Sequence, residues 1–264
     1  MSHFSANKIR AGYSKHNVIE DISFDLNSGT LMGIIGANGS GKTTLLKALC
    51  GILPHRGTCT LGDTVLEELP AKQLARLVSY IPQRSGISID ISALDVVLMG
   101  FNSHLGLLEH PNKTMKEKAM QALHQVGLAG KEETNYLHLS EGQKQLCILA
   151  RTLVSDSSLL LLDEPESALD FRFRHQMLSL LRSWVASRER SAVVTLHDPA
   201  LALNFCDRLL LLSEGGVLAI LEPKSDSLDK MEQMLRQIYG SISLQRCHNR
   251  KGQAQIVMLR EDEV

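Results

Sequence analysis

The segment from Gly36 to Thr43 has the residue types and spacing needed to bind phosphate. It reads Gly-Ala-Asn-Gly-Ser-Gly-Lys-Thr and fits the P-loop pattern GxxxxGK[ST]. The glycines allow backbone amides to close around phosphate oxygens, and a helix beginning there adds the positive end of its dipole. In this pattern Lys42 supplies a charge to the terminal phosphates and the Thr43 hydroxyl can ligate Mg²⁺. The alternative is a glycine-rich turn that only caps a helix.

The flanking sequence contains the strand and the helix that such a loop requires. Leu31 to Ile35 is uniformly apolar, as in a buried parallel strand, whereas Asp21 to Leu26 alternates as in a half-buried one. Thr43 to Cys50 predicts a helix that ends at Gly51 and Pro54. The order strand, glycine loop, helix is therefore the order that a phosphate site needs.

A pair of acids, Asp163 and Glu164, follows the apolar run Leu159 to Leu162. The carboxyl end of a strand is the edge where α/β sheets bind ligands. There Asp163 can hold Mg²⁺ through its coordination shell, and Glu164 can orient and deprotonate an attacking water. The pair alone also fits a helix cap, since Pro165 suits a first helical turn.

The segment between these two groups of residues has helical periodicity, from about Ser85 to Leu139. One face of a predicted helix there carries Met115, Ala119, Ala122, Leu123 and Val126. After the acids, Ala192 to Leu196 and Arg208 to Leu212 predict further parallel strands, and Gly215-Gly216 predicts a hairpin into Val217 to Leu221. An inserted helical subdomain therefore interrupts an α/β sheet.

The segment Leu139-Ser-Glu-Gly-Gln143 lies about twenty residues before the acids and resembles the LSGGQ signature of ATP-binding-cassette (ABC) ATPases. By this resemblance Ser140, Gly142 and Gln143 face the γ-phosphate of an ATP held by a second subunit. The same residues form a capping box with Ser140 as N-cap, and both interpretations can hold, because a capped helix amino terminus is also an anion site.

Other positions resemble this family in the expected order. The resemblance implies that Tyr13 stacks on adenine, that Gln83 senses γ-phosphate and magnesium, and that His197 contacts γ-phosphate. Ser167-Ala-Leu-Asp170 resembles the D-loop that crosses the dimer interface. The full set of implied nucleotide-binding residues is Tyr13, Gly36, Asn38, Gly39, Ser40, Gly41, Lys42, Thr43, Thr44, Ser140, Gly142, Gln143 and Asp170, with Glu164, His197 and Gln83 as catalytic residues and Thr43, Gln83 and Asp163 at the metal.

Two residues depart from the family pattern. Glu141 replaces the usual glycine of the signature, and Glu166 replaces the usual threonine after Asp163-Glu-Pro165. A carboxylate in the first turn of a helix suits the dipole but is unfavourable if it points at phosphate. The effect of Glu141 on ATP affinity therefore stays open.

The resemblance implies a P-loop NTPase (RecA-like) α/β core with an antiparallel β subdomain and an inserted α-helical signature subdomain. We expect one ABC ATPase domain over 1–264, with the core and β subdomain in 1–84 and 156–221, the helical subdomain in 85–155 and a tail in 222–264. Its implied ligands are ATP and Mg²⁺. Its implied partners are a second copy in a head-to-tail dimer, integral membrane permease subunits and, indirectly, a substrate-binding protein.

Composition favours a partner that is a protein. The formal net charge of −1 and pI of about 6.8 indicate neither nucleic acid nor an anionic lipid surface as partner. Five cysteines without CxxC spacing predict buried thiols in a reducing cytosol rather than disulfides or a zinc site. Without a signal peptide or a long apolar run, the chain is expected at the cytoplasmic face of the cell membrane, held there by the permease.

A further resemblance points to importers of iron-siderophore, haem or cobalamin type. It rests on Leu94 to Gly100 with His104, and on the tail from Leu235 to Leu259. If Val97, Leu98 and Met99 receive a permease loop, they should be partly exposed in the isolated subunit. An ordinary amphipathic helix and an edge hairpin are the alternative for these segments. A soluble ABC ATPase acting on ribosomes or DNA is the alternative function.

Overall fold

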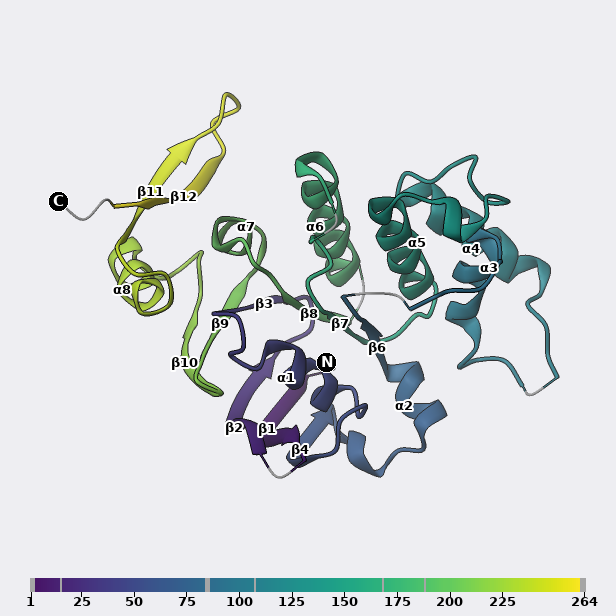
Figure 1. Cartoon of the computed structure of the whole chain (residues 1–264), viewed down its shortest axis with the longest axis horizontal. Coiled ribbons are helices and arrows are strands. Elements are labelled where there is room, and N and C mark those ends of the chain that lie inside the picture. Colours follow the sequence, from purple (N-terminus) through teal and green to yellow (C-terminus); the bar gives the residue numbers. More distant parts are fainter. Residues whose placement is uncertain are drawn as a thin grey trace.

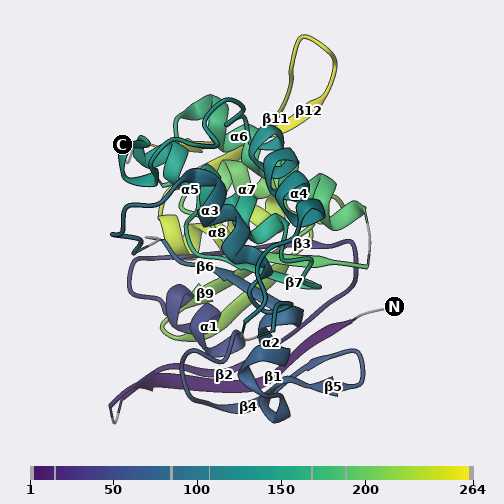
Figure 2. The same cartoon turned by 90° about the vertical axis from the view of Figure 1, so that its right-hand side faces the viewer.

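The computed structural model describes residues 3–14, 16–83, 86–106, 108–167, 169–187 and 189–261. Ala168 of the D-loop segment and Ser85, the first residue of the expected helical subdomain, lie outside these ranges. The described chain forms two sheets with helices between and above them, and a small separate hairpin near the carboxyl terminus (Figures 1 and 2).

A six-stranded sheet with the order β10-β9-β3-β8-β7-β6 forms the centre of the molecule. All its neighbouring pairs are parallel except β9 and β10, which form the hairpin expected at Gly215-Gly216. Both faces of the sheet are covered, which is why its strands are nearly continuous apolar runs. The strands are β3 (Leu31–Gly36), β6 (Val78–Ile81), β7 (Leu159–Leu162), β8 (Ser191–Thr195), β9 (Arg208–Ser213) and β10 (Gly216–Leu221).

An antiparallel sheet with the order β2-β1-β4-β5 forms a second layer. Its strands alternate between buried and exposed residues because only one face meets the core. Helix α1 (Lys42–Leu49) lies between this sheet and the central one, and its apolar residues join both in one cluster (Figure 2). The remaining elements are β1 (Phe4–Tyr13), β2 (His16–Leu26), β4 (His55–Leu61), β5 (Thr64–Val65), η1 (Leu66–Glu68) and α2 (Ala71–Leu77).

The helical segment packs on the opposite face of the central sheet, at the right of Figure 1. Its α4 buries Ala119, Ala122 and Leu123, the face expected from periodicity. Side-chain caps at Ser92, Asn112 and Ser140 begin its three α-helices. The elements are α3 (Ala93–Leu98), η2 (Met99–Phe101), α4 (Lys113–Gln125), η3 (Tyr136–His138) and α5 (Glu141–Leu153).

The expected exposure of Val97 and Leu98 is wrong. Val97 is fully buried and Leu98 is 7% exposed, while Met99 is half-buried. The short helix α3 is covered by α4 on one side and α5 on the other, so that no face carrying these residues is left open. The next turn packs as closely, since a Cβ on Gly100 would lie 2.1 Å from the Arg151 carbonyl oxygen. Val97 and Leu98 therefore belong to the core of the helical layer.

Helices α6 (Phe171–Ala186) and α7 (Pro199–Phe205) complete the covering of the central sheet, and α8 (Leu228–Tyr239) follows β10. The antiparallel pair β11 (Ile242–His248) and β12 (Ala254–Arg260) then projects from the body (Figure 1). In the part of the chain that the structure describes, no helix has the length and apolar character needed to cross a membrane. The predicted fold class is confirmed, whereas the subdomain boundaries stay a prediction.

Candidate active site

The loop between β3 and α1 leaves a helix amino terminus open to a ligand. Gly41, the N-cap of α1, has φ of 100° and provides no side-chain cap, so the first amides of the helix are not occupied by a capping group. A side chain cannot be added here, because a Cβ on Gly41 would lie 2.5 Å from Ile19 and one on Gly36 would lie 2.3 Å from the Leu212 carbonyl oxygen. Close packing therefore requires both glycines, and at Gly41 the left-handed backbone conformation requires it as well.

Lys42 lies over this loop and is held by it. Its Nζ donates hydrogen bonds to the carbonyl oxygens of Gly36 at 2.8 Å and Ala37 at 3.1 Å. Burial lowers the pKa of Lys42, and the nearby Glu164 and Asp163 carboxylates oppose that shift. The cavity beside it has a volume of about 180 Å³ and is lined by Val18, Asn38, Gly39, Gly41, Lys42, Thr43, Thr44 and Glu164.

The acid pair lies at the end of β7, in a turn and not at the start of a helix. Glu164 has φ of 47°, a strained backbone conformation for a non-glycine residue. The Thr195 hydroxyl holds this turn, because it accepts from the Glu164 amide at 2.7 Å and donates to Asp163 Oδ1 at 3.0 Å. Asp163 is 2% exposed and Glu164 is 9% exposed, so both acids are buried at the end of β7.

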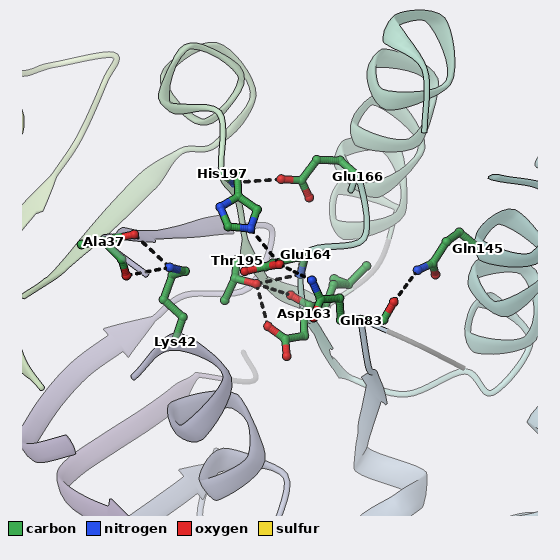
Figure 3. Close-up of polar contacts among 11 residues, drawn as sticks. Ala37, Lys42, Gln83, Gln145, Asp163, Glu164, Glu166, Thr195 and His197 are labelled. Carbon is green, nitrogen blue, oxygen red and sulfur yellow. Dashed lines mark hydrogen bonds and ion pairs between the residues drawn. The ribbon is translucent and has the colours of Figure 1, made fainter. Parts of the chain in front are cut away.

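The three predicted catalytic residues meet at one oxygen atom. Glu164 Oε2 accepts from Gln83 Nε2 at 2.5 Å and lies 2.8 Å from His197 Nε2 (Figure 3). The backbone carbonyl of Gln83 in turn accepts from Gln145 Nε2 at 2.7 Å, which connects the site to α5. The structure thus brings Gln83, Glu164 and His197 together beside the phosphate-binding loop.

Glu166, one of the two departures from the family pattern, supports His197. Its Oε1 accepts a hydrogen bond from the His197 amide at 2.9 Å (Figure 3). It is 2% exposed, and within the described chain its Oε2 has no hydrogen-bond partner. Burial raises the pKa of the Glu166 carboxyl, although the His197 amide opposes this. Glu166 is therefore a positioning residue for the histidine.

Glu166→Gln should raise the free energy of unfolding at neutral pH relative to wild type. A raised folded-state pKa means that the native protein binds the proton better than the unfolded chain. The contribution of the protonated Glu166 carboxyl to stability is thus complete below the pKa of about 4.3 that this group has in the unfolded chain. It is lost as the pH rises through the higher pKa of the folded state. Urea unfolding at pH 4 and pH 8 should show that the free energy of unfolding of the variant, relative to that of wild type, is higher at pH 8 than at pH 4. An equal difference at both values would contradict this.

The signature segment forms the expected capping box at the start of α5. The Gln143 amide donates to Ser140 Oγ at 3.3 Å, and the Ser140 amide donates to Gln143 Oε1 at 3.1 Å. Glu141 is paired with Lys144 at 2.8 Å, an exposed contact that offsets its charge. None of the described residues lining the P-loop cavity comes from this segment. Gly142 and its neighbours therefore contribute nothing to the lining of the chain's own P-loop cavity.

The last two predicted contacts lie elsewhere. Asp170 is the N-cap of α6 and accepts from the Phe173 amide at 3.0 Å. Tyr13 ends β1, is 49% exposed and lines an open groove of about 590 Å³ with residues of the β1–β2 turn and of the start of β4. The structure thus leaves Ser140 and Asp170 as helix caps and Tyr13 accessible.

Sequence reasoning missed three residues that shape the site. Thr195 was part of a predicted strand, and its only signal was a hydroxyl within an apolar run. The Tyr80 hydroxyl lies 3.4 Å from Asp163 Oδ2, and burial raises its pKa, which keeps it a donor. Gln145 follows the signature without any pattern of its own. All three act across strands or helices that are distant in sequence.

Comparison with known proteins places this arrangement in a family. The family described as "ABC transporter" matches residues 19–167. The chain is 36% identical over 232 residues to the hemin import ATP-binding protein HmuV of Bordetella bronchiseptica, covering 84% of this chain and 86% of the relative. It is 34% identical over 204 residues to a probable iron chelatin transport ATP-binding protein of Helicobacter pylori, covering 76% and 80%.

A solved structure extends the similarity to nearly the whole chain. It is a metal-chelate type ABC transporter in an inward-facing conformation, with a TM-score of 0.83, 28% identity and coverage of 99% of both chains. The matched family residues include the phosphate loop and the acid pair whose geometry is described above. The chain belongs to the ABC transporter family, as an ATP-binding and ATP-hydrolysing subunit.

Proposed function

We propose that this subunit powers an importer of iron-siderophore, haem or cobalamin type, bound through a permease to the cytoplasmic face of the membrane. The observation that carries the proposal is the similarity to a hemin import and an iron chelatin transport ATP-binding protein over three quarters or more of the chain. The similarity of the whole fold, tail hairpin included, to a metal-chelate type transporter supports it.

We infer that two copies pack head to tail and share two ATP molecules. The reason is that Ser140, Gly142 and Gln143 do not line the P-loop cavity of their own chain. In a symmetric pair each signature helix can close the partner's phosphate site, with its amino terminus toward the γ-phosphate. Asp170, at the start of α6, would lie at the same interface.

The oxygen donors of the site fit Mg²⁺. Thr43, Asp163 and the side-chain oxygen of Gln83 are hard ligands of the kind that Mg²⁺ prefers, and Gln83 uses only its nitrogen for Glu164. Bound there with ATP, Mg²⁺ would neutralise charge on the phosphate oxygens. Asp163 is oriented for this by Thr195 and Tyr80.

In the hydrolysis step Glu164 acts as the general base. The water oxygen attacks the γ-phosphorus, the bond from that phosphorus to the bridging oxygen breaks, and the water proton passes to Glu164. Before this, Lys42 must exchange the carbonyls of Gly36 and Ala37 for phosphate oxygens. Gln83 and His197 must likewise turn from Glu164 toward the nucleotide.

The permease contact must lie elsewhere than on the buried Val97 and Leu98. The segment after Gln83 offers Ile89, which is 55% exposed and lies between the catalytic glutamine and α3. An exposed apolar side chain there suits a membrane-protein loop. The contact would pass ATP-dependent movement of Gln83 to the permease.

Crosslinking tests this proposal. Ile89→Cys, placed in a Cys247→Ser background to remove the exposed native thiol, should crosslink to a co-expressed permease. A cysteine at the exposed Leu259 on the tail hairpin is the matched control and should not. In reconstituted complexes a binding protein loaded with haem or an iron chelate should stimulate ATP hydrolysis. If no crosslink to the permease forms and the protein co-sediments firmly with ribosomes or DNA, the importer proposal is wrong and the function is that of a soluble ABC ATPase.

A further inference from the structure

A second cluster of chemically active side chains lies in the antiparallel β subdomain. Among the residues that the structure describes, His55, Cys59 and Glu67 form one group whose potential ligand atoms all lie within 4.8 Å of one another. His55 and Cys59 belong to β4, and Glu67 belongs to η1, which directly follows β5. None of the three lines the P-loop cavity.

The imidazole of His55 is oriented as a metal-binding histidine would be. Its Nδ1 faces the Leu53 carbonyl oxygen at 3.4 Å, and its Nε2 lies 2.9 Å from Glu67 Oε1. A ring N–H donated to a backbone carbonyl is the usual support of a metal-bound histidine, because it directs the other nitrogen's lone pair at the cation. The 2.9 Å between Nε2 and the carboxylate oxygen is a hydrogen-bond distance, so a cation binding there would replace the bridging proton and move the two groups apart.

Glu67 connects this histidine to the cysteine. The same Oε1 accepts a hydrogen bond from the Cys59 amide at 2.7 Å, so the carboxylate lies against β4 beside the thiol. Cys59 is 1% exposed. Burial and the Glu67 carboxylate raise the pKa of the Cys59 thiol, which therefore keeps its proton when no cation is present.

The cluster also has an entry path. The side chain of His55 is 8% exposed, and it lines the groove of about 590 Å³ that contains Tyr13. Glu67 retains 30% of its side-chain exposure. The cluster is therefore reached by solvent mainly through the Glu67 carboxylate, with His55 at the edge of the groove.

We propose that His55, Cys59 and Glu67 form a binding site for a zinc-class divalent cation outside the P-loop cavity, contrary to the expectation from the cysteine spacing that the chain has no zinc site. Nitrogen, sulfur and oxygen ligands together select borderline-soft ions such as Zn²⁺ over Mg²⁺ or Ca²⁺. Binding joins the cation to Nε2, Sγ and a carboxylate oxygen, and both the thiol proton and the proton between Nε2 and Glu67 leave to solvent. Zinc–ligand bonds of about 2.0–2.3 Å place ligand atoms roughly 3.5 Å apart, so the more distant ligand atoms must close by up to roughly 1 Å, whereas Nε2 and Glu67 Oε1 must separate by roughly 0.5 Å.

The test uses the nucleotide-free full chain, which makes it independent of transport. Cys247 and His248, adjacent on the exposed strand β11, could bind zinc adventitiously, so the reference protein carries Cys247→Ser and His248→Ala. Competition with a chromogenic chelator should show one zinc per chain. Cobalt in place of zinc should show a thiolate-to-cobalt charge-transfer band, and affinity should fall at lower pH because the thiol proton must leave.

Variants locate the site. Cys59→Ala should abolish the cobalt band, and Glu67→Gln should weaken zinc by at least the roughly 10- to 100-fold that losing a supporting partner costs. Cys50→Ala, half-buried and outside the cluster, is the control and should keep the band. If the folded reference protein binds no zinc, or if the band persists in Cys59→Ala, the site is refuted. Because the reference protein leaves all three ligands in place, this outcome does not depend on a core variant folding.

Discussion

Glu164→Gln should slow ATP hydrolysis by roughly 10²- to 10⁴-fold, the usual contribution of a positioned general base. The amide has nearly the size of the carboxylate, so the contacts with Gln83 and His197 can be kept while the proton acceptor is lost. ATP should still bind, and the trapped dimer should be seen by size exclusion with ATP and Mg²⁺. Phosphate release gives the rate.

Two further variants test whether Glu164 is the general base. Glu117→Gln makes the same chemical change on the exposed surface of α4 and should leave hydrolysis unchanged. Asp163→Asn should instead weaken nucleotide binding that depends on Mg²⁺, because this residue is assigned to the metal. Tight ATP binding with normal hydrolysis in Glu164→Gln would show that another group activates the water.

Heterodimers of Lys42→Ala with Ser140→Arg subunits should recover activity that neither homodimer has. If each site combines one chain's phosphate loop with the other's signature, one site carries both lesions and the other carries none. A symmetric pair has two equivalent sites, so the heterodimer should reach up to about half of the wild-type rate. The measurement is ATPase activity of a heterodimer isolated through two different tags.

The homodimers of each variant are the controls, and both should be inactive. If the signature instead serves the nucleotide of its own chain, the heterodimer should be inactive, because each of its two chains would then carry a damaged site. An inactive heterodimer of confirmed composition would therefore argue against the shared site. This result would leave the role of Glu164 untouched, since the general base is tested separately.

Local patterns predicted much of the catalytic framework. The apolar run of β3, the glycine loop and α1 follow one another within twenty residues, and each is determined by backbone conformation and burial of its own segment. The capping box at Ser140 and the β9–β10 hairpin are similarly local. The expected exposure of Val97 was wrong because helical periodicity identifies an apolar face but does not say how many neighbours cover it.

The sequence by itself determined the family and the α/β core and predicted the groups at the phosphate site, since these depend on short motifs and their order. Only the tertiary structure decided that Thr195 holds Asp163 and Glu164, because parallel pairing of β7 and β8 brings together residues about thirty positions apart. It also decided the burial of Glu166 beneath His197 and the meeting of His55 with Cys59 and Glu67. Such contacts depend on strand register and layer packing, which no single segment specifies.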